Sequence, residues 1–323
     1  MRTIAVLNQK GGVGKTTTVV NTAAALATMG FKVVVIDLDP QSHLTIHLGV
    51  EPRTIESGSY GVLIRQAQFE REILLVRPNL WLLPANINLV GAESELITEV
   101  GRETILREAI GTVEDKFDYI FIDCPPSLSL LTLNALAAAG EILIPIQPHF
   151  LALQGFGKLL QTVELVNRRI NPSLKVKGIL LCMFDSRTSL SGEVKADIER
   201  FLDNAHGSNN AWAEARILPT FIRRNIKLAE APSYGKTIFE YEKNCHGAED
   251  YKKVAEYLRD SESASQIYGS VERLTDAADQ DNVEAVRNKP PIKIVEISRA
   301  DSQSSPKSDS TYSYPVEGDD ENF

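Results

Sequence analysis

Short apolar runs alternate with longer stretches of helical periodicity along most of the chain. The apolar runs are rich in β-branched residues and show little polar alternation, which is typical of strands covered on both faces of a parallel sheet. We expect strands at residues 4–7, 32–37, 80–84, 118–123, 142–146, 176–184 and 215–218. Helical spacing predicts helices over residues 15–29, 93–110, 129–139, 154–167, 192–202 and 247–259. This alternation predicts a mostly parallel, doubly wound α/β sheet with helices on both faces.

Two segments depart from the alternation. Residues 51–79 are weakly patterned and contain Gly58 and Gly61, so we expect a loop with a short helix there. Beyond about residue 260 the sequence is dominated by Ser, Asp, Glu and Pro, apart from the strand-like run IKIVEI at 292–297. Too little apolar surface is present to offset chain entropy, so we predict a folded domain over 1–260 and a disordered acidic tail over 261–323.

A glycine-rich stretch, NQKGGVGKTTT (residues 8–18), joins the first strand to the first helix. Such a turn points several unpaired backbone N–H groups at one spot beside the positive end of the helix dipole, which suits a phosphate. Lys15 adds a mobile cation, and Thr16 is placed to ligate a magnesium ion. The expected phosphate-binding residues are Lys10, Gly11, Gly12, Val13, Gly14, Lys15, Thr16 and Thr17.

The stretch departs from the usual phosphate-loop pattern at two positions. Gln9 stands where that pattern has its first glycine, and Lys10 adds a second lysine ahead of the loop. Lys10 either stays in solvent or reaches a phosphate, and two lysines of one chain are poorly placed to grip the same oxygens. One economical solution is that Lys10 crosses to the nucleotide of a second subunit, which implies a homodimer.

Aspartates follow two of the predicted strands. Asp123 ends the strand at 118–123, and Asp37 and Asp39 end the strand at 32–37 and point to one side. Ligands bind beyond the carboxyl ends of parallel strands, so these carboxylates are expected beside the glycine-rich stretch. Asp123 would hold a magnesium-bound water and orient Thr16. Of Asp37 and Asp39, one would position the loop or the metal's water shell, and the other would orient the attacking water. The candidate metal residues are Thr16, Asp37 and Asp123.

Composition and charge limit the class of protein and its expected location in the cell. The chain has 323 residues, of which 43% are hydrophobic, and a net charge of −9. Residues 260–323 carry 14 acidic and 6 basic side chains, so the predicted folded domain is close to neutral. No segment approaches the ~20 apolar residues of a membrane span, and three widely spaced cysteines are typical of buried thiols in a reducing cytoplasm.

Several segments together resemble one protein family. KGGVGKTTT, VIDLDPQ, DYIFIDCPPS, PIQPHFLALQG and IRRNIKLAEAPSYGKTI resemble the ParA/Soj partition ATPases, in the deviant-Walker-A group of P-loop NTPases that also contains MinD. The resemblance covers residues 1 to about 260, in the family's order and spacing.

The resemblance implies roles for particular residues. Lys10 would contact the partner's nucleotide in an ATP-sandwich dimer, Lys15 the phosphates, and Asp39 the hydrolytic water, while Asp123 would be the Walker B carboxylate. Asn225 would lie beside the adenine. It closes the segment Arg223-Arg224-Asn225, in which Arg223 replaces the family's proline. The implied nucleotide-binding residues therefore include Arg223 and Asn225.

The resemblance also implies a cycle. Mg²⁺ and ATP close the dimer, the dimer binds DNA without sequence preference, and a ParB-like partner stimulates a slow basal ATPase and causes release. The expected location is the cytoplasm, on the nucleoid. The candidate DNA contacts are Arg187, Lys195, Arg223, Arg224, Lys227, Lys252 and Lys253.

Three alternatives share the same phosphate loop. A MinD-like membrane-cycling ATPase would need a basic amphipathic C-terminal helix, and the acidic tail argues against it. An electron carrier resembling nitrogenase reductase would need paired cysteines for an iron–sulfur cluster, and Cys124 has no evident partner. An ATPase that positions another cargo on the nucleoid has the same motor, and the sequence does not separate it from a partition ATPase.

Overall fold

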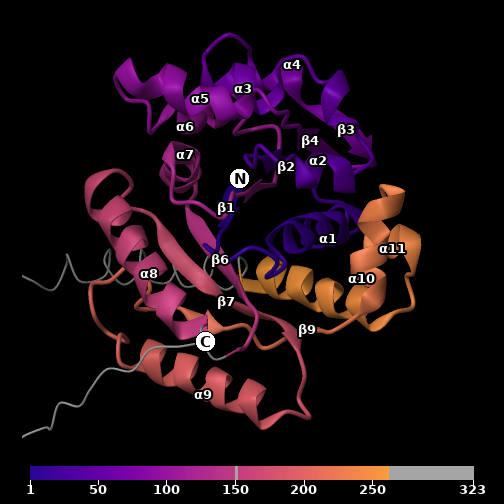
Figure 1. The fold of residues 1–323 in the computed structure, drawn as a ribbon, viewed down its shortest axis with the longest axis vertical. Coiled ribbons are helices and arrows are strands. Elements are labelled where there is room, and N and C mark those ends of the chain that lie inside the picture. The colour runs from indigo at the N-terminus through magenta and orange to yellow at the C-terminus, as the bar shows by residue number, and fades with distance from the viewer. Residues whose placement is uncertain (150–151, 262–323) are drawn as a thin grey trace, which may run out of the picture. The chain divides into compact units, whose positions relative to one another are not determined.

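The computed structural model describes residues 1–149 and 152–261, and the predicted tail and the run at 292–297 lie outside them. The described strands form a nine-stranded sheet in the order β3-β4-β2-β5-β1-β6-β7-β8, and β9 pairs with β7 off this path (Figure 1). Only the β3–β4 pair is antiparallel. The strands are β1 (Arg2–Val6), β2 (Val33–Asp37), β3 (Leu74–Arg77), β4 (Leu80–Leu83), β5 (Tyr119–Asp123), β6 (Glu141–Ile146), β7 (Lys175–Phe184), β8 (Arg216–Ile217) and β9 (Ile222–Arg223).

Helices cover both faces of the sheet, as the sequence predicts (Figure 1). Side chains alternate along each strand, so on β1 Ile4 and Val6 pack with α1 while Ala5 and Leu7 belong to the core of the other face. The helices are α1 (Lys15–Thr28), α2 (His43–His47), α3 (Gly58–Leu63), α4 (Phe69–Glu72), α5 (Leu89–Glu95), α6 (Ile105–Gly111), α7 (Leu130–Ala138), α8 (Ala152–Arg169), α9 (Ser189–Asp203), α10 (Ile226–Glu230) and α11 (Ile238–Tyr241), with 3₁₀ turns η1 (Pro52–Thr54), η2 (Leu96–Thr98) and η3 (Ala231–Tyr234). A closing helix over residues 246–261 packs beside α1.

Every predicted strand is present, and two other predictions need correction. The single helix expected over residues 93–110 is wrong, because α5 and η2 end before Gly101 and α6 begins only at Ile105. Gly101 adopts a φ of +72°, the left-handed conformation in which helices end. The segment 51–79 is more structured than expected, since it holds two short helices, a 3₁₀ turn and the edge strand β3. Periodicity alone did not resolve such short elements.

The central strands bring the predicted aspartates to one edge of the sheet. β5 lies between β1 and β2, and Asp123 is in register with Val6 on one side and with Asp37 on the other. The chain leaves β1 at this edge and enters the glycine-rich loop before α1. The carboxyl ends of the three strands therefore frame the loop, as expected for a ligand site of a parallel sheet.

Candidate nucleotide-binding site

The glycine-rich loop has a conformation that demands glycine at two positions. Gly12 and Gly14 have φ values of +73° and +96°, a region that side chains disfavour. Gly14 directly precedes α1, whose first turn starts at Lys15. No side chain caps this helix start, so its free N–H groups face the loop and can bind an anion.

Lys15 is buried beneath this loop. Its side-chain ammonium donates a hydrogen bond to the Lys10 carbonyl at 3.3 Å. Burial lowers the pKa of Lys15, and the nearby Asp123 carboxylate opposes this shift. A desolvated ammonium among backbone N–H groups binds a phosphate oxygen more strongly than one in solvent.

Thr16 and Asp123 are joined directly. The Thr16 hydroxyl donates to Oδ2 of Asp123 at 2.6 Å, whereas Oδ1 of Asp123 is buried and has no hydrogen-bond partner among the described residues. Burial, followed by the charge of Asp37, raises the pKa of Asp123 well above its usual range. An orphaned carboxylate oxygen beside a hydroxyl fits a hydrated magnesium ion, which would satisfy that oxygen and favour its ionised form.

Asp37 is fully buried and holds the chain that follows it. Its Oδ2 accepts hydrogen bonds from the amide and hydroxyl of Thr45, at 2.9 and 2.7 Å, and its Oδ1 accepts one from the Asp39 amide. Burial raises the pKa of Asp37 to about 7, against these hydrogen bonds. Both oxygens of Asp37 are thus engaged by Asp39 and Thr45, in the segment that follows β2. These contacts favour a role for Asp37 in positioning this segment over a role in binding the metal.

Asp39 lies half-buried at the rim. Its Oδ1 accepts a hydrogen bond from the Gln41 amide at 2.9 Å, so the turn fixes the carboxylate. Its charge acts on both Lys15 and Asp123, which places it beside the phosphate and metal groups. Asp39 is thus the more accessible of the paired aspartates.

Lys10 contacts a residue that the sequence did not single out. Its ammonium meets Nε2 of His149, just after β6, and its amide donates to Oδ1 of Asn8 at 2.9 Å. The Asn8 amide group in turn donates to the Pro145 carbonyl at 2.7 Å. These contacts hold the start of the glycine-rich loop against the end of β6, and the Lys10 side chain contacts its own chain.

A cavity of about 830 Å³ extends from the loop toward α10 and η3. It is lined by loop residues and Asp39 at one end and by Arg223 and Asn225 at the other. The Asn225 side chain caps α10, because its Oδ1 accepts the Lys227 amide at 2.9 Å. The cap engages the side-chain oxygen of Asn225, and no hydrogen bond of its Nδ2 is found within the described residues.

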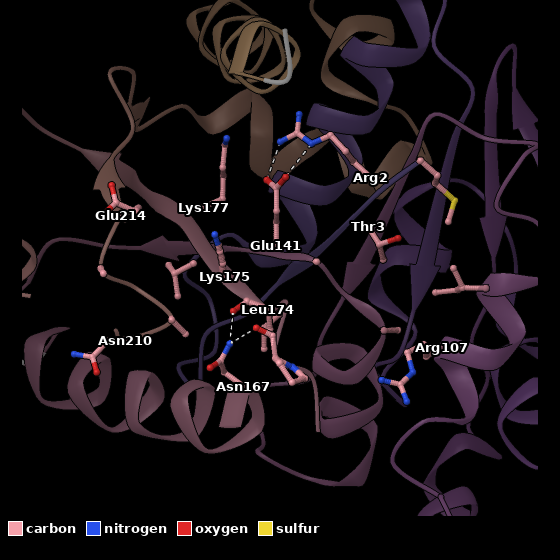
Figure 2. A pocket seen from close by; sticks show the side chains of 18 of the residues that line it. Arg2, Thr3, Arg107, Glu141, Asn167, Leu174, Lys175, Lys177, Asn210 and Glu214 are labelled. Carbon is pink, nitrogen blue, oxygen red and sulfur yellow. Dashed lines mark hydrogen bonds and ion pairs between the residues drawn. The ribbon is translucent and has the colours of Figure 1, made fainter. Parts of the chain in front are cut away.

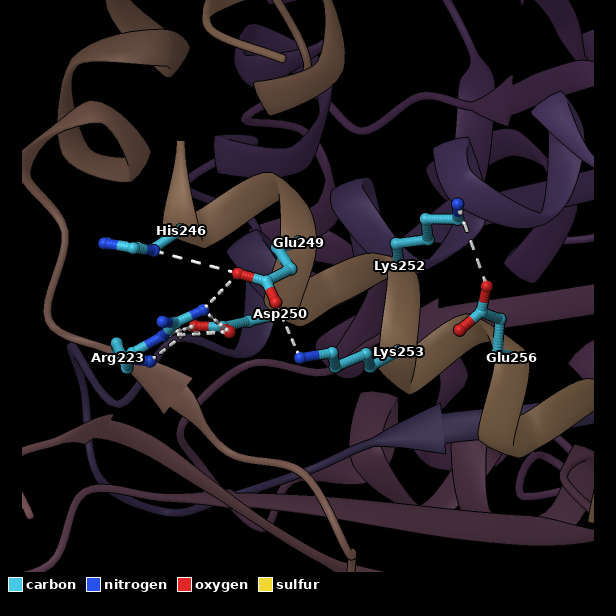
Figure 3. A network of polar contacts seen from close by, with 7 residues as sticks. All are labelled: Arg223, His246, Glu249, Asp250, Lys252, Lys253 and Glu256. Atoms are coloured by element: carbon cyan, nitrogen blue, oxygen red, sulfur yellow. Dashed lines mark hydrogen bonds and ion pairs between the residues drawn. The ribbon is translucent and has the colours of Figure 1, made fainter. Parts of the chain in front are cut away.

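Most candidate DNA-binding side chains are paired with carboxylates (Figure 3). The Arg223 guanidinium bonds to Asp250 and Glu249, at distances down to 2.5 Å. Glu249 also pairs with Lys253, and these contacts lower its pKa to about 2. The other pairs are Arg187–Asp185, Lys195–Glu199, Lys227–Glu230 and Lys252–Glu256. Arg224 alone among the seven candidates has no hydrogen bond or ion pair within residues 1–149 and 152–261, although its charge helps to lower the pKa of Asp185.

Sequence reasoning missed three supporting residues. Thr45 anchors Asp37, His149 meets Lys10, and the Tyr251 hydroxyl of the closing helix bonds to the Thr18 hydroxyl at 3.2 Å beneath the loop. Thr45 lies eight residues beyond Asp37, and Tyr251 lies 233 residues beyond Thr18. Local sequence patterns carry no signal for such pairs.

The fold and the site define a class. A parallel sheet with a glycine-rich loop between β1 and α1, a lysine and a threonine at the helix start and an aspartate at the end of β5 is a P-loop NTPase. Residues 1–176 match the family described as "AAA domain". None of the helices within the described residues is long and apolar enough to cross a membrane.

Two curated relatives identify the family. The sporulation initiation inhibitor protein Soj of Bacillus subtilis is 42% identical over 253 residues, which are 78% of this chain and 96% of that protein. The chromosome-partitioning ATPase Soj of Thermus thermophilus is 45% identical over 259 residues, which are 79% of this chain and 94% of that protein. The chain belongs to the Soj/ParA family of chromosome-partitioning ATPases.

A solved structure adds a ligand-bound neighbour. The cobyrinic acid a,c-diamide synthase from Mycobacterium smegmatis with bound ADP and magnesium has a TM-score of 0.68 and 36% sequence identity, and covers 82% of this chain and 96% of its own. The same protein has also been solved with an ATP analogue and magnesium. This fold therefore holds a magnesium–nucleotide complex in a neighbour of similar architecture.

Proposed function

We propose that this chain is a magnesium-dependent ATPase of DNA partition, whose ATP-bound homodimer holds DNA and releases it after hydrolysis. The observation that carries the ATPase is the Thr16–Asp123 hydrogen bond, beside an orphaned carboxylate oxygen at the mouth of a P-loop. The Soj relatives and the magnesium–nucleotide complexes of the structural neighbour support ATP and Mg²⁺ as the ligands.

The residues of the nucleotide site have separate roles. The backbone of Gly11 to Gly14 and the Lys15 ammonium bind the phosphates, and Thr16 with Asp123 holds the magnesium ion and its water. When bound, Mg²⁺ neutralises charge that develops on the phosphates. Asp39 orients the attacking water, and Asp37 fixes the turn that carries Asp39. Such a site works by placement and charge stabilisation, so a slow basal rate is expected.

Lys10 makes the site dimeric in this proposal. It rests against His149 in the single chain, and Lys15 already occupies the phosphate side of the loop. Lys10 is released from His149 and contacts the nucleotide of the partner subunit when ATP closes the dimer. A second positive charge on the phosphates would also aid hydrolysis.

DNA binding and control complete the proposal. Glu249, Asp250 and Glu256 partly neutralise the cations drawn in Figure 3. We therefore assign Arg224 as the leading contact to the DNA phosphates. The other six candidates remain predictions. A ParB-like partner stimulates hydrolysis, and the chain works in the cytoplasm on the nucleoid.

DNA retention across nucleotide states and salt tests this function. The chain is applied to immobilised non-specific DNA with ATP, ADP or no nucleotide, each in Mg²⁺ and across a salt series. We expect retention only with ATP, falling steeply as salt rises because phosphate contacts release counterions. A Lys15→Ala chain is the matched control and should not be retained with ATP. Equal retention in all three nucleotide states would contradict the proposal.

A further inference from the structure

A second cavity lies at the opposite edge of the sheet from the nucleotide site. It has a volume of about 960 Å³ and is bounded by the starts of β1, β6 and β7, the end of α6, the loop at 208–214 and Tyr257 of the closing helix (Figure 2). We call it the amino-edge cavity. Small-molecule sites in proteins have volumes of roughly 300–1,000 Å³. The space is therefore of the size that a metabolite needs.

Four basic side chains line this cavity: Arg2, Arg107, Lys175 and Lys177. Lys175 and Lys177 are two residues apart on β7, where the pairing with β6 shifts register between Val176 and Gly178. Figure 2 shows both rising from β7 into the cavity.

The nearest carboxylate is already engaged. Glu141 on β6 is in register with Lys175 on β7. Both oxygens of Glu141 nevertheless accept hydrogen bonds from Arg2, at 3.0 and 2.7 Å. Within the described ranges, the ammonium groups of Lys175 and Lys177 make no hydrogen bond or ion pair. Two lysines therefore enter the cavity without a counter-charge of their own.

Lys177 is the more constrained of the two. It is half-buried, and burial, aided by the charge of Arg2, lowers its pKa while Glu141 opposes the shift. A partly desolvated cation without a hydrogen-bonded partner is costly to keep charged, and a bound anion would remove that cost. The turn that leads into β7 is held in place, because the Asn167 side chain donates to the Leu174 and Pro172 carbonyls at 2.9 and 3.0 Å.

Glu114 and Glu214 also line the cavity, so that three carboxylates, with Glu141, stand against its four basic side chains. Both are exposed, and Oε1 of Glu214 lies 3.7 Å from Nδ1 of His206. The side-chain amide of Asn210 adds a group that can donate hydrogen bonds. Ammonium groups act as point charges toward phosphate oxygens. The wall made by β7 and the 208–214 loop therefore suits an anion.

We propose that the amino-edge cavity is a binding site for a small phosphate-bearing polyanion, with Lys175 and Lys177 as its principal contacts. The site is independent of the proposed ATPase. β1 connects the two, because it begins at Arg2 in the cavity and leads into the glycine-rich loop at its other end.

Trp212 offers a local probe of this cavity. It lies between the lining residues Ala211 and Ala213, and the chain's other tryptophan, Trp81, packs on Phe117 from β4, which four strands separate from β7 in the sheet order. The test uses the full chain with Trp81→Phe, with Mg²⁺ and ADP in excess to fill the P-loop. Fructose 1,6-bisphosphate is titrated as a probe with two phosphates, and inorganic phosphate as a probe with one.

We expect saturable quenching or enhancement of Trp212 fluorescence by the bisphosphate, and weaker binding of inorganic phosphate. The double variant Lys175→Gln/Lys177→Gln should weaken bisphosphate binding at least tenfold. Lys158→Gln, an exposed lysine of α8 away from the cavity, should leave it unchanged. Calorimetry of the same titration detects a ligand that binds without altering Trp212.

Two results would overturn the site. The first is the absence of saturable binding by both fluorescence and calorimetry, or equal binding by the double variant and the parent chain. The second is the absence of bisphosphate binding by the parent chain together with loss of ATP-dependent DNA retention in the double variant, because the lysines would then serve DNA rather than a metabolite. Failure of DNA retention in the parent chain would leave this titration unaffected, so the two proposals fail separately.

Discussion

The Thr16 hydroxyl and the Asp123 carboxylate, 107 positions apart in sequence, lie 2.6 Å from each other at the mouth of the P-loop. This hydrogen bond uses one carboxylate oxygen and leaves the other buried without a partner among the described residues. Burying an unsatisfied carboxylate oxygen is unfavourable, so the arrangement is one that a hydrated cation would complete.

Replacing Asp123 by Asn should abolish magnesium-dependent turnover. We expect ATP hydrolysis to fall at least a hundredfold, or about 2.7 kcal/mol of transition-state stabilisation, because the magnesium water loses its acceptor. The measurement is steady-state phosphate release across a Mg²⁺ series. Asp118→Asn, just before the other end of β5, is the matched control and should keep its activity, since the Asp118 side chain accepts only the Lys32 amide among the described residues. Similar rates for both variants would contradict the role of Asp123.

Asp37 and Asp39 should give different phenotypes when each is replaced by Ala. Asp39 is half-exposed and accepts only the Gln41 amide in its described contacts, so Asp39→Ala should fold normally, bind ATP and stay on DNA with negligible turnover. Asp37→Ala removes the acceptor of three buried hydrogen bonds and should lower the free energy of unfolding by about 3 kcal/mol. Thermal melts and ATPase assays of both variants separate the roles. If Asp39→Ala hydrolyses ATP normally, the water-orienting role moves to Asp37.

The Lys10–His149 contact predicts opposite effects on dimer formation. Lys10→Ala should remove ATP-dependent dimerisation, while His149→Ala should favour it by about fivefold, because one hydrogen bond holding Lys10 on its own subunit is lost. Sedimentation of each variant with ATP, ADP and no nucleotide measures this. Unchanged dimerisation of Lys10→Ala would rule out its contact with the partner's nucleotide, whereas weaker dimerisation of His149→Ala would show that His149 supports the closed state.

Arg224→Glu and Arg223→Glu form a matched pair for DNA binding. Arg224→Glu should weaken DNA retention and reduce its salt dependence while ATP still binds. Arg223→Glu should lower thermal stability and weaken ATP binding too, because Asp250, whose side chain is only 4% exposed, loses the guanidinium at the rim of the nucleotide cavity and keeps only the backbone amide of residue 223 among its described contacts. Retention assays, nucleotide titrations and melts distinguish the two. Loss of ATP binding in Arg224→Glu would reassign that residue to the nucleotide site.

His47 predicts a pH dependence of stability. It is buried, its Nε2 has no hydrogen-bond partner in the part of the chain that the structure describes, and burial lowers its pKa from 6.5 to about 4. Between those values the unfolded chain binds the proton and the folded chain does not, so stability falls as the pH drops from 6.5 to 4. His47→Leu should flatten this fall by up to about 3 kcal/mol. Urea unfolding of both chains without nucleotide, at pH 4.5 and 7, measures the difference, and parallel curves would exclude His47 as the cause.

The sequence predicts the architecture because its signals are local and strong. β2 and β5 are unbroken apolar runs that end in Asp37 and Asp123, and the rule that parallel strands present ligands at their carboxyl ends brings these residues together. The prediction fails where elements are short, as in the region around Gly101, which breaks the expected helix. Nor does a charge count show which cations are paired, and this separates Arg223 from Arg224.

Charge balance at the nucleotide site bears on how ligands enter. Asp39 and Asp123 act on the one buried ammonium of the site, Lys15, and burial favours the protonated form of Asp123 while no cation is bound. A nucleotide that enters with a divalent cation would therefore displace a proton from this carboxyl, whereas a bare nucleotide would leave it protonated. Loading of the site should accordingly depend on pH as well as on the concentration of the cation.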